Sequence, residues 1–325
     1  MKFIGVMSIF AVLLAGCGPE GAPRGEELVC NVAQKPWTSP QHPSGSELVT
    51  EHYRIFTTVS SNHALLCSMP AFMEASYRNY LSLTGLADRE LSEKLVVYLM
   101  SAREEWASLT KQIVGSQSNL YLSIEAGGYC YQGVCVFWDL GGYTTLSVAA
   151  HEGLHQFLSK RLADQLPMWV EEGLCTTAEG YEFYGGRVLF TPGRNVFRFS
   201  HLRWALINGP WLPASKLIGM DAGDVVGGVS ETALAYYGQL WILMQFIQSS
   251  PAYREGLHRL MADAQAGKFH EELGMSAQEL ARLRAGGRSY NRSIGPKIFE
   301  HYITADLTKF DREYLQYAKN QAKLK

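Results

Sequence analysis

The stretch His151-Glu152-Gly153-Leu154-His155 lies near the middle of the 325-residue chain. On an α-helix, residues four positions apart project from the same face, so His151 and His155 can direct both imidazoles at one metal ion. Glu152 is rotated by about 100° from His151, because a helix has about 3.6 residues per turn. This offset suits Glu152 to accept a proton from a metal-activated water instead of binding the metal. The stretch predicts a metal-binding helix over residues 144–160.

A third ligand is expected on the next helix. The apolar pattern breaks at residues 163–166, and Pro167 suits the first position of a second helix. That helix carries Glu171-Glu172-Gly173, and sixteen residues separate His155 from Glu172. This separation is long enough for a turn and an antiparallel helix that returns to the metal. Glu172 is the preferred third ligand, and its neighbour Glu171 is the alternative.

The combined pattern, HExxH followed by Pro-x-Trp-x-x-Glu-Gly, resembles the gluzincin metallopeptidases and most of all their bacterial peptidase-MA-like branch. By position, His151, His155 and Glu172 match the zinc ligands of that family, and Glu152 matches its catalytic glutamate. The interval before Glu172 is shorter than in the clan's aminopeptidases, and the chain has no Gly-x-Met-Glu-Asn run for a substrate's free amino group. The resemblance therefore implies an endopeptidase that acts on peptides or proteins.

A weaker likeness extends to Tyr237-Gly238-Gln239-Leu240-Trp241 on a later apolar helix. It implies that Tyr237 stabilises the oxyanion; Tyr236 is adjacent, and the alternative for a tyrosine on so apolar a helix is a packed core position. Two imidazoles and a carboxylate leave one zinc ion with an open position, where the pKa of water falls to about 7. The predicted function is a membrane-anchored, zinc-dependent peptide hydrolase with Glu152 as its general base. The alternative is a catalytically weak or silent module that binds ligands at the cell surface.

The N-terminus predicts export and a lipid anchor. A positive start, Met1-Lys2, precedes an apolar run at residues 3–14 that is too short to span a bilayer. Leu14-Ala15-Gly16-Cys17 resembles a bacterial lipobox, which implies removal of residues 1–16 and acylation of Cys17; an ordinary secretory peptide is the alternative. Gly18 carries no negative charge, so we expect the outer membrane or the cell surface of a bacterial envelope rather than the inner membrane.

Two parts are expected in the mature chain. Residues 17–48 contain five of the twelve prolines and predict an extended tether. Residues 49–325 predict one α+β domain, with a small sheet and the zinc core in 49–190 and a mostly helical part in 191–325. The strands are expected at residues 53–59, 95–100 and 129–138, and the main flanking helices at 64–83, 103–114, 232–248, 252–266, 277–285 and 310–323.

The hairpin at residues 129–138 carries two further expectations. Residues 134–138 are predicted to form the sheet edge along the cleft and to pair with substrate backbone, with a purely structural hairpin as the alternative. If Gln132-Gly133 is a two-residue turn, Cys130 faces Cys135 at a short separation that suits a disulfide. Cys30 with Cys67 is a second expected pairing, and Cys175 is expected to be a buried thiol.

Composition limits the partners. The 47% hydrophobic and 12% aromatic content is ample for a sizeable core. The net charge of −2 gives no long-range attraction to nucleic acid, and the chain has no basic run with interleaved aromatics. The expected partners are therefore a peptide or protein substrate and the membrane that holds Cys17. Composition does not determine the oligomeric state.

Overall fold

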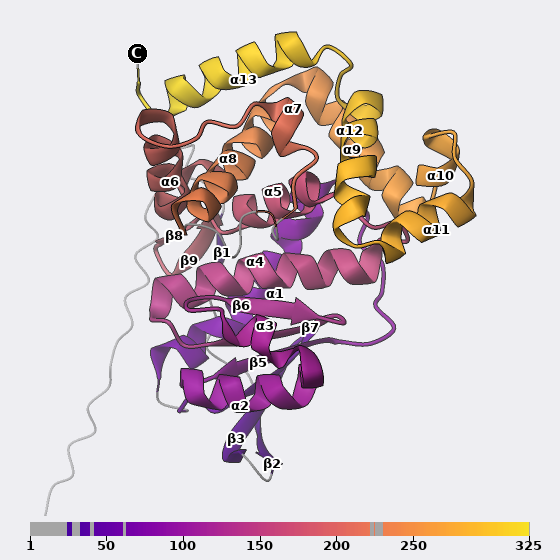
Figure 1. Cartoon of the computed structure of the whole chain (residues 1–325). Coiled ribbons are helices and arrows are strands. Elements are labelled where there is room, and N and C mark those ends of the chain that lie inside the picture. The colour runs from indigo at the N-terminus through magenta and orange to yellow at the C-terminus, as the bar shows by residue number, and fades with distance from the viewer. Residues whose placement is uncertain are drawn as a thin grey trace, which may run out of the picture.

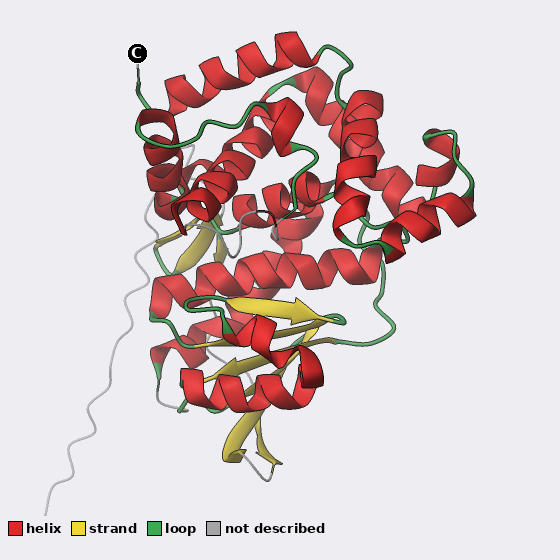
Figure 2. Cartoon of the chain, in the orientation of Figure 1, coloured by secondary structure: helices red, strands yellow, loops and turns green. Residues whose placement is uncertain are grey.

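The computed structural model describes residues 25–27, 33–39, 42–60, 63–221, 224 and 230–324. Figure 1 shows a six-stranded sheet at one end of the molecule, the long helix α4 (Gly142–Arg161) across the middle, and the C-terminal helices at the other end. Strands and helices are thus largely segregated, which confirms the predicted α+β class (Figure 2). None of the helices within these described ranges is long and apolar enough to cross a membrane.

The six-stranded sheet has the order β2-β3-β4-β5-β7-β6. Its centre is parallel and consists of β4 (Tyr53–Thr57), β5 (Leu95–Met100) and β7 (Val134–Trp138). Parallel neighbours require a crossover connection, and helices supply both of them. The chain crosses from β4 to β5 through α1 (Ala64–Thr84), and from β5 toward β7 through α2 (Arg103–Val114), η1 (Gly115–Gln117) and α3 (Ser118–Leu122).

One edge of the sheet lies in the region predicted to be a tether. β2 (Gln34–Ser39) and β3 (His42–Val49) form an antiparallel hairpin, and β3 also pairs with β4. Trp37 packs against Phe56 with ring centroids 5.3 Å apart, and Leu48 is buried. The tether prediction is therefore wrong for residues 34–39 and 42–48. Prolines are tolerated in β2 because an edge strand leaves one row of backbone groups unpaired.

The other edge of the sheet corrects the substrate-strand prediction. β6 (Gly128–Tyr131) pairs only with β7, so β6 is the edge strand and residues 134–138 lie inside the sheet between β5 and β6. The burial of the β7 side chains on both faces agrees with this inner position, since a two-sided strand reads as a continuous apolar run. The hairpin turn itself was predicted correctly, because Gln132 and Gly133 both have positive φ.

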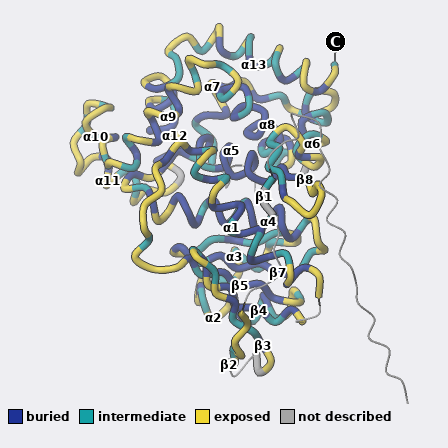
Figure 3. Tube along the Cα trace, turned by 180° about the vertical axis from the view of Figure 1, so that it is seen from behind, coloured by how far each residue is buried: buried dark blue, intermediate teal, exposed yellow. Residues whose placement is uncertain are grey.

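The helical part begins with α4 and α5 (Met168–Ala178), which pack against each other. Burial is extensive along α1, α4 and α5, as the tube in Figure 3 shows. A small second sheet has the order β1-β9-β8. β8 (Tyr181–Tyr184) and β9 (Arg187–Phe190) follow α5 in the chain, and β1 (Glu26–Glu27) comes from the N-terminal region. The remaining elements are η2 (Pro192–Arg194), α6 (Val196–Ile207), α7 (Ala214–Leu217), α8 (Ser230–Ser249), α9 (Pro251–Ala266), α10 (Phe269–Glu272), α11 (Ala277–Ala285), α12 (Arg288–Tyr302) and α13 (Leu307–Gln321).

Candidate metal centre

The two histidines of α4 converge as the helix periodicity predicts. The Nε2 atoms of His151 and His155 lie 3.3 Å apart, and both side chains are only 14–16% exposed. Two rings on one helical face would normally avoid so short a nitrogen–nitrogen approach unless a proton or a cation lay between them. The arrangement provides two converging nitrogen donors.

Helix α5 supplies a carboxylate to the same point. The Oε2 atom of Glu172 lies 3.4 Å from His151 Nε2, and Oε1 lies 3.6 Å from His155 Nε2. Donor atoms around a tetrahedral zinc ion lie about 3.3 to 3.4 Å apart, because Zn–N distances are about 2.0–2.1 Å. Glu172 is 6% exposed, and its buried Oε2 has no hydrogen-bond partner among the described residues. The residues present therefore fit a bound cation.

Cys175 is a fourth donor beside this set. Each of the side chains of His151, His155 and Cys175 offers one ligand atom, and these three atoms lie within 4.8 Å of one another. They therefore also form a group that can hold a metal ion. The Cys175 side chain is fully buried, one turn after Glu172 on α5. Burial raises the pKa of the Cys175 thiol to about 12, although the neighbouring His155 acts in the opposite direction. Two ligand sets, with Glu172 or with Cys175, thus share the two imidazoles.

The electrostatics of the centre come from buried groups of opposite sign. Burial lowers the pKa of His151, but the adjacent carboxylates of Glu172 and Glu179 outweigh this effect and raise the pKa to about 9. Burial raises the pKa of Glu172, yet the two imidazoles lower it by more. The carboxylate is therefore held in the ionised form that a metal ligand requires.

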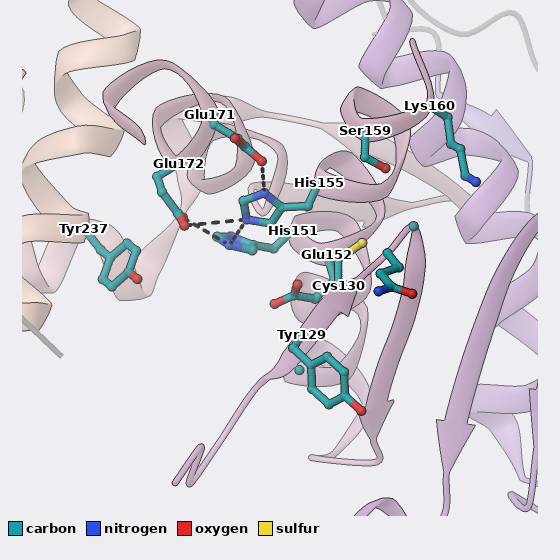
Figure 4. Close-up of a pocket in the computed structure, with 13 residues that line it drawn as sticks. Tyr129, Cys130, His151, Glu152, His155, Ser159, Lys160, Glu171, Glu172 and Tyr237 are labelled. Atoms are coloured by element: carbon teal, nitrogen blue, oxygen red, sulfur yellow. Dashed lines mark hydrogen bonds and ion pairs between the residues drawn. The ribbon is translucent and has the colours of Figure 1, made fainter. Parts of the chain in front are cut away.

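Each imidazole is oriented by a carboxylate at its other nitrogen. His151 Nδ1 lies 2.8 Å from Glu179 Oε1, and His155 Nδ1 lies 2.8 Å from Glu171 Oε1. Such contacts direct the Nε2 atom of a histidine toward a metal and fix the orientation of the ring. Glu171 is thus placed beside the ligand set, while Glu172 points into it (Figure 4).

Glu179 is itself held by α6. Arg198 donates from Nε to Oε2 at 2.9 Å and from Nη2 to Oε1 at 2.6 Å, and Asn195 Nδ2 donates to Oε2 at 2.7 Å. Burial raises the pKa of Glu179, but Arg198 and His151 lower it to about 2. The buried carboxylate is therefore fully partnered and remains ionised.

The candidate centre opens into a cavity of about 530 Å³. Glu152 and Tyr237 line it together with the two histidines and Glu172, so the structure brings every predicted residue of the zinc site to one cleft. Tyr236 is fully buried and does not line this cavity, so Tyr237 is the one of the two adjacent α8 tyrosines that faces it. Residues 128–130 of the edge strand β6 also line it.

A second cavity, of about 480 Å³, shares His151, Glu152 and Tyr237 with the first. Its wall is largely apolar, formed by Ile124, Val148, Phe197, Ala233 and Leu234. The two cavities meet at His151, Glu152 and Tyr237, so the space beside the candidate centre continues toward this apolar wall.

The predicted disulfide in the hairpin is corrected. Cys130 faces Cys135 in register, as predicted, but both thiols are free. The Cys135 sulfur lies 3.1 Å from the carbonyl oxygen of Glu152 and donates to it instead. Cys67 is disulfide-bonded, whereas its predicted partner Cys30 and the predicted lipidation site Cys17 lie outside the described residues.

The sequence interpretation missed the groups behind the ligands. Glu179 lies seven residues after Glu172, two helical turns away and therefore on the same side of α5, so helical spacing could have indicated it. Arg198 and Asn195 carry no such signal, because they reach Glu179 from a separate element.

In comparisons with known proteins, no protein-family model, curated protein or solved structure matches this chain.

Proposed function

We propose that the protein is a zinc-dependent peptide hydrolase of the gluzincin type, an endopeptidase anchored to the bacterial cell envelope through Cys17. The observation that carries this proposal is the convergence of three side chains, in which the two Nε2 atoms lie 3.3 Å apart and the two oxygens of Glu172 lie 3.4 and 3.6 Å from them. One of these oxygens is buried and has no hydrogen-bond partner among the described residues. His151, His155 and Glu172 would hold one zinc ion. When bound, zinc supplies a Lewis acid that polarises a carbonyl and lowers the pKa of water to about 7.

Glu152 is the proposed general base. It follows His151 on α4 and lines the same cavity, and Figure 4 shows its carboxylate apart from the converging side chains of His151, His155 and Glu172. Burial raises the pKa of its carboxyl group, although the two imidazoles partly oppose this. A carboxylate in this place can accept a proton from the attacking water and deliver it to the leaving amine.

Tyr237 is the proposed oxyanion donor. Its ring lies beneath the Arg198 guanidinium, with 5.2 Å between the guanidinium carbon and the ring centroid. Arg198 therefore fixes Tyr237 on one side and Glu179 on the other, which couples the position of the hydroxyl to that of His151. Burial raises the pKa of the Tyr237 hydroxyl, so the group remains a proton donor at neutral pH.

An extended peptide is the proposed substrate. Two cavities meet at His151, Glu152 and Tyr237, so there is space for substrate on more than one wall beside the proposed catalytic groups. The edge strand β6 lines the cleft and has no strand beyond it in the described sheet, so its backbone can add a peptide strand. The apolar wall around Leu234 favours a large apolar side chain next to the scissile bond.

Glu152→Gln tests the function directly. The substitution keeps the size of the side chain but removes the proton acceptor, and Glu152 is not a proposed ligand. We expect zinc stoichiometry to remain at one, while hydrolysis of a peptide selected from a random library falls by about 10²- to 10⁴-fold. The matched control is Glu300→Gln, which changes an exposed glutamate on α12 and should alter neither quantity.

Two results would contradict the mechanism or favour the other function. Undiminished cleavage by Glu152→Gln with zinc bound would exclude Glu152 as the base. If the wild-type protein binds zinc and retains peptides from the library without cleaving any, the surface binding module is the better description.

A further inference from the structure

Large apolar side chains gather on one exposed surface away from the metal ligands. Five residues from three elements form it, and each is at least 38% exposed: Tyr143 at the start of α4, Phe183 and Tyr184 of β8, and Val196 and Phe197 at the start of α6. We call this set the aromatic face. Scattered single exposed hydrophobics are normal, whereas a contiguous group marks a contact surface.

Ring contacts connect most of the aromatic face. Tyr143 stacks on Tyr181 with centroids 4.8 Å apart, and Phe183 and Phe197 approach these two rings at 5.3 and 6.2 Å. The same elements enclose a shallow cavity of about 500 Å³, which Tyr143, Phe183 and Val196 help to line. These three side chains therefore border one apolar hollow, with Phe197 against Tyr143 and Tyr184 beside Phe183 at the end of β8.

The β8–β9 hairpin presents the most exposed part of this surface. Gly185 and Gly186 both have positive φ and form the two-residue turn between Tyr184 and Arg187. Tyr184 is 69% exposed, and Arg187 is exposed beside it. An aromatic side chain with a polar tip next to a cation is the combination that occurs where proteins meet lipid headgroups.

The chain enters the domain at this same hairpin. Glu26 and Glu27 of β1 pair with Val188 and Arg187 of β9. Only eight residues separate Cys17 from Glu26 in the sequence. The nine residue-to-residue steps from Cys17 to Glu26 span at most about 30 Å when fully extended, so a lipid on Cys17 keeps the hairpin within that distance of the bilayer.

We propose that the aromatic face docks onto the lipid bilayer that holds the Cys17 anchor. A bilayer is favoured over a second copy of the chain or another protein because the short connection from Cys17 to β1 brings this surface to the membrane. The docking adds a second contact with the bilayer to the one that the lipid anchor makes. It rests on the proposed anchor and is independent of the proposed hydrolase.

Docking would also orient the cleft. Phe197 belongs to the aromatic face and lines the apolar cavity beside His151, so one end of the cleft adjoins the docked surface. Substrates would then enter from the side of the bilayer, as parts of membrane-associated proteins would.

Fluorescence quenching on the full lipidated chain tests the docking. Bimane is attached to Tyr184→Cys or to Leu120→Cys, and the chain is reconstituted in vesicles of phosphatidylethanolamine and phosphatidylglycerol with acyl chains brominated near the headgroup. Leu120 on α3 is the matched control, since it is 66% exposed but lies outside the aromatic face. Labelling of the parent chain gives the background from Cys130, Cys135 and Cys175.

The expected result is quenching at Tyr184→Cys at least about threefold stronger than at Leu120→Cys, because interfacial aromatic positions lie at headgroup level. Adding Phe183→Ser and Val196→Ser to Tyr184→Cys should reduce this quenching to the control value. Equal quenching at both labelled positions would overturn the proposal. So would quenching that is unaffected by the two serines, or a chain that does not float with the vesicles. The measurement involves no catalysis, so it fails or succeeds independently of the hydrolase.

Discussion

At the scale of single residues, the choice between Glu172 and Cys175 decides what kind of metal centre this is. The carboxylate has a buried oxygen without a hydrogen-bond partner among the described residues, whereas burial keeps the Cys175 thiol protonated. We therefore expect Glu172→Ala to lose zinc and Cys175→Ser to retain it. Glu171→Ala should also retain zinc, with affinity weakened by about 10- to 100-fold because Glu171 only orients His155. Zinc stoichiometry and competition with a chelator measure all three. If Cys175→Ser loses zinc while Glu172→Ala retains it, Cys175 is the third ligand and Glu172 is not.

Glu179 gives the centre a defined dependence on acid. Its pKa is lowered from an ordinary 4.5 to about 2, so its contribution to stability is complete above pH 4.5 and is lost as the pH falls toward 2. This shift corresponds to about 3 kcal/mol of unfolding free energy. We expect the zinc-free wild type to lose about that much stability between pH 5 and 2 in excess of Glu179→Gln, measured by urea unfolding. His151, whose raised pKa is about 9, remains protonated across this window and does not interfere. Parallel pH profiles for the two proteins would contradict the prediction.

At the scale of elements, the close packing of α1 on α4 depends on Gly153. A Cβ atom at this position would lie 2.5 Å from the Tyr80 hydroxyl and 3.3 Å from the Met73 methyl group. Tyr80 is fully buried and donates to the Ala150 carbonyl at 2.9 Å, so its hydroxyl cannot move away without losing that bond. Gly153 is therefore required by helix packing.

The corresponding test is a double-mutant cycle. Gly153→Ala should destabilise the protein by about 1–3 kcal/mol through overpacking. Tyr80→Phe removes the obstructing hydroxyl and should cost about 1 kcal/mol alone. The loss of unfolding free energy in the double variant, measured by urea unfolding, should be smaller than the sum of the two single losses. Strict additivity would show that the hydroxyl is not what excludes the Cβ atom.

Elements also show how far the sequence could be interpreted. Strand β5 and helices α2 and α11 coincide with their predicted bounds, because each has a clear apolar period and local end signals. The convergence of His151, His155 and Glu172 was predictable for the same reason, since it depends only on spacing along two adjacent helices. The pairing of β2 and β3 was not, because the prolines near them indicated a tether and the partner strand β4 is a separate segment. Arg198 was missed for a similar reason, because no local sequence pattern indicates that its side chain binds Glu179, which belongs to another segment.

At the scale of the whole molecule, the candidate centre lies where the two parts of the domain meet. α4 packs against α1 and the β6–β7 hairpin, while α5 packs against α4 and α8, so the two imidazoles and the carboxylate come from opposite walls of the cleft. Tyr237 comes from α8 and Glu152 from α4, which distributes the proposed catalytic groups in the same way. Relative movement of these walls would change the distance from Glu172 to both histidines, so the rigidity of the α4–α5–α8 packing sets the geometry of the site.

The envelope location proposed for the whole molecule depends on one thiol. Cys17 is the only cysteine in the Leu14-Ala15-Gly16-Cys17 stretch. In the proposed lipoprotein, residues 1–16 are removed and Cys17 is acylated. We expect a fatty-acid analogue to label the wild type in a bacterial host and to fail completely on Cys17→Ser. Cys130→Ser is the matched control, because it removes a partly exposed thiol elsewhere and should leave the label unchanged. Since Gly18 gives no negative charge after the acylated residue, fractionation of a double-membraned host should place the labelled protein in the outer membrane. Label that persists on Cys17→Ser would exclude this anchor, and with it the short connection that brings β1 and the aromatic face to the bilayer.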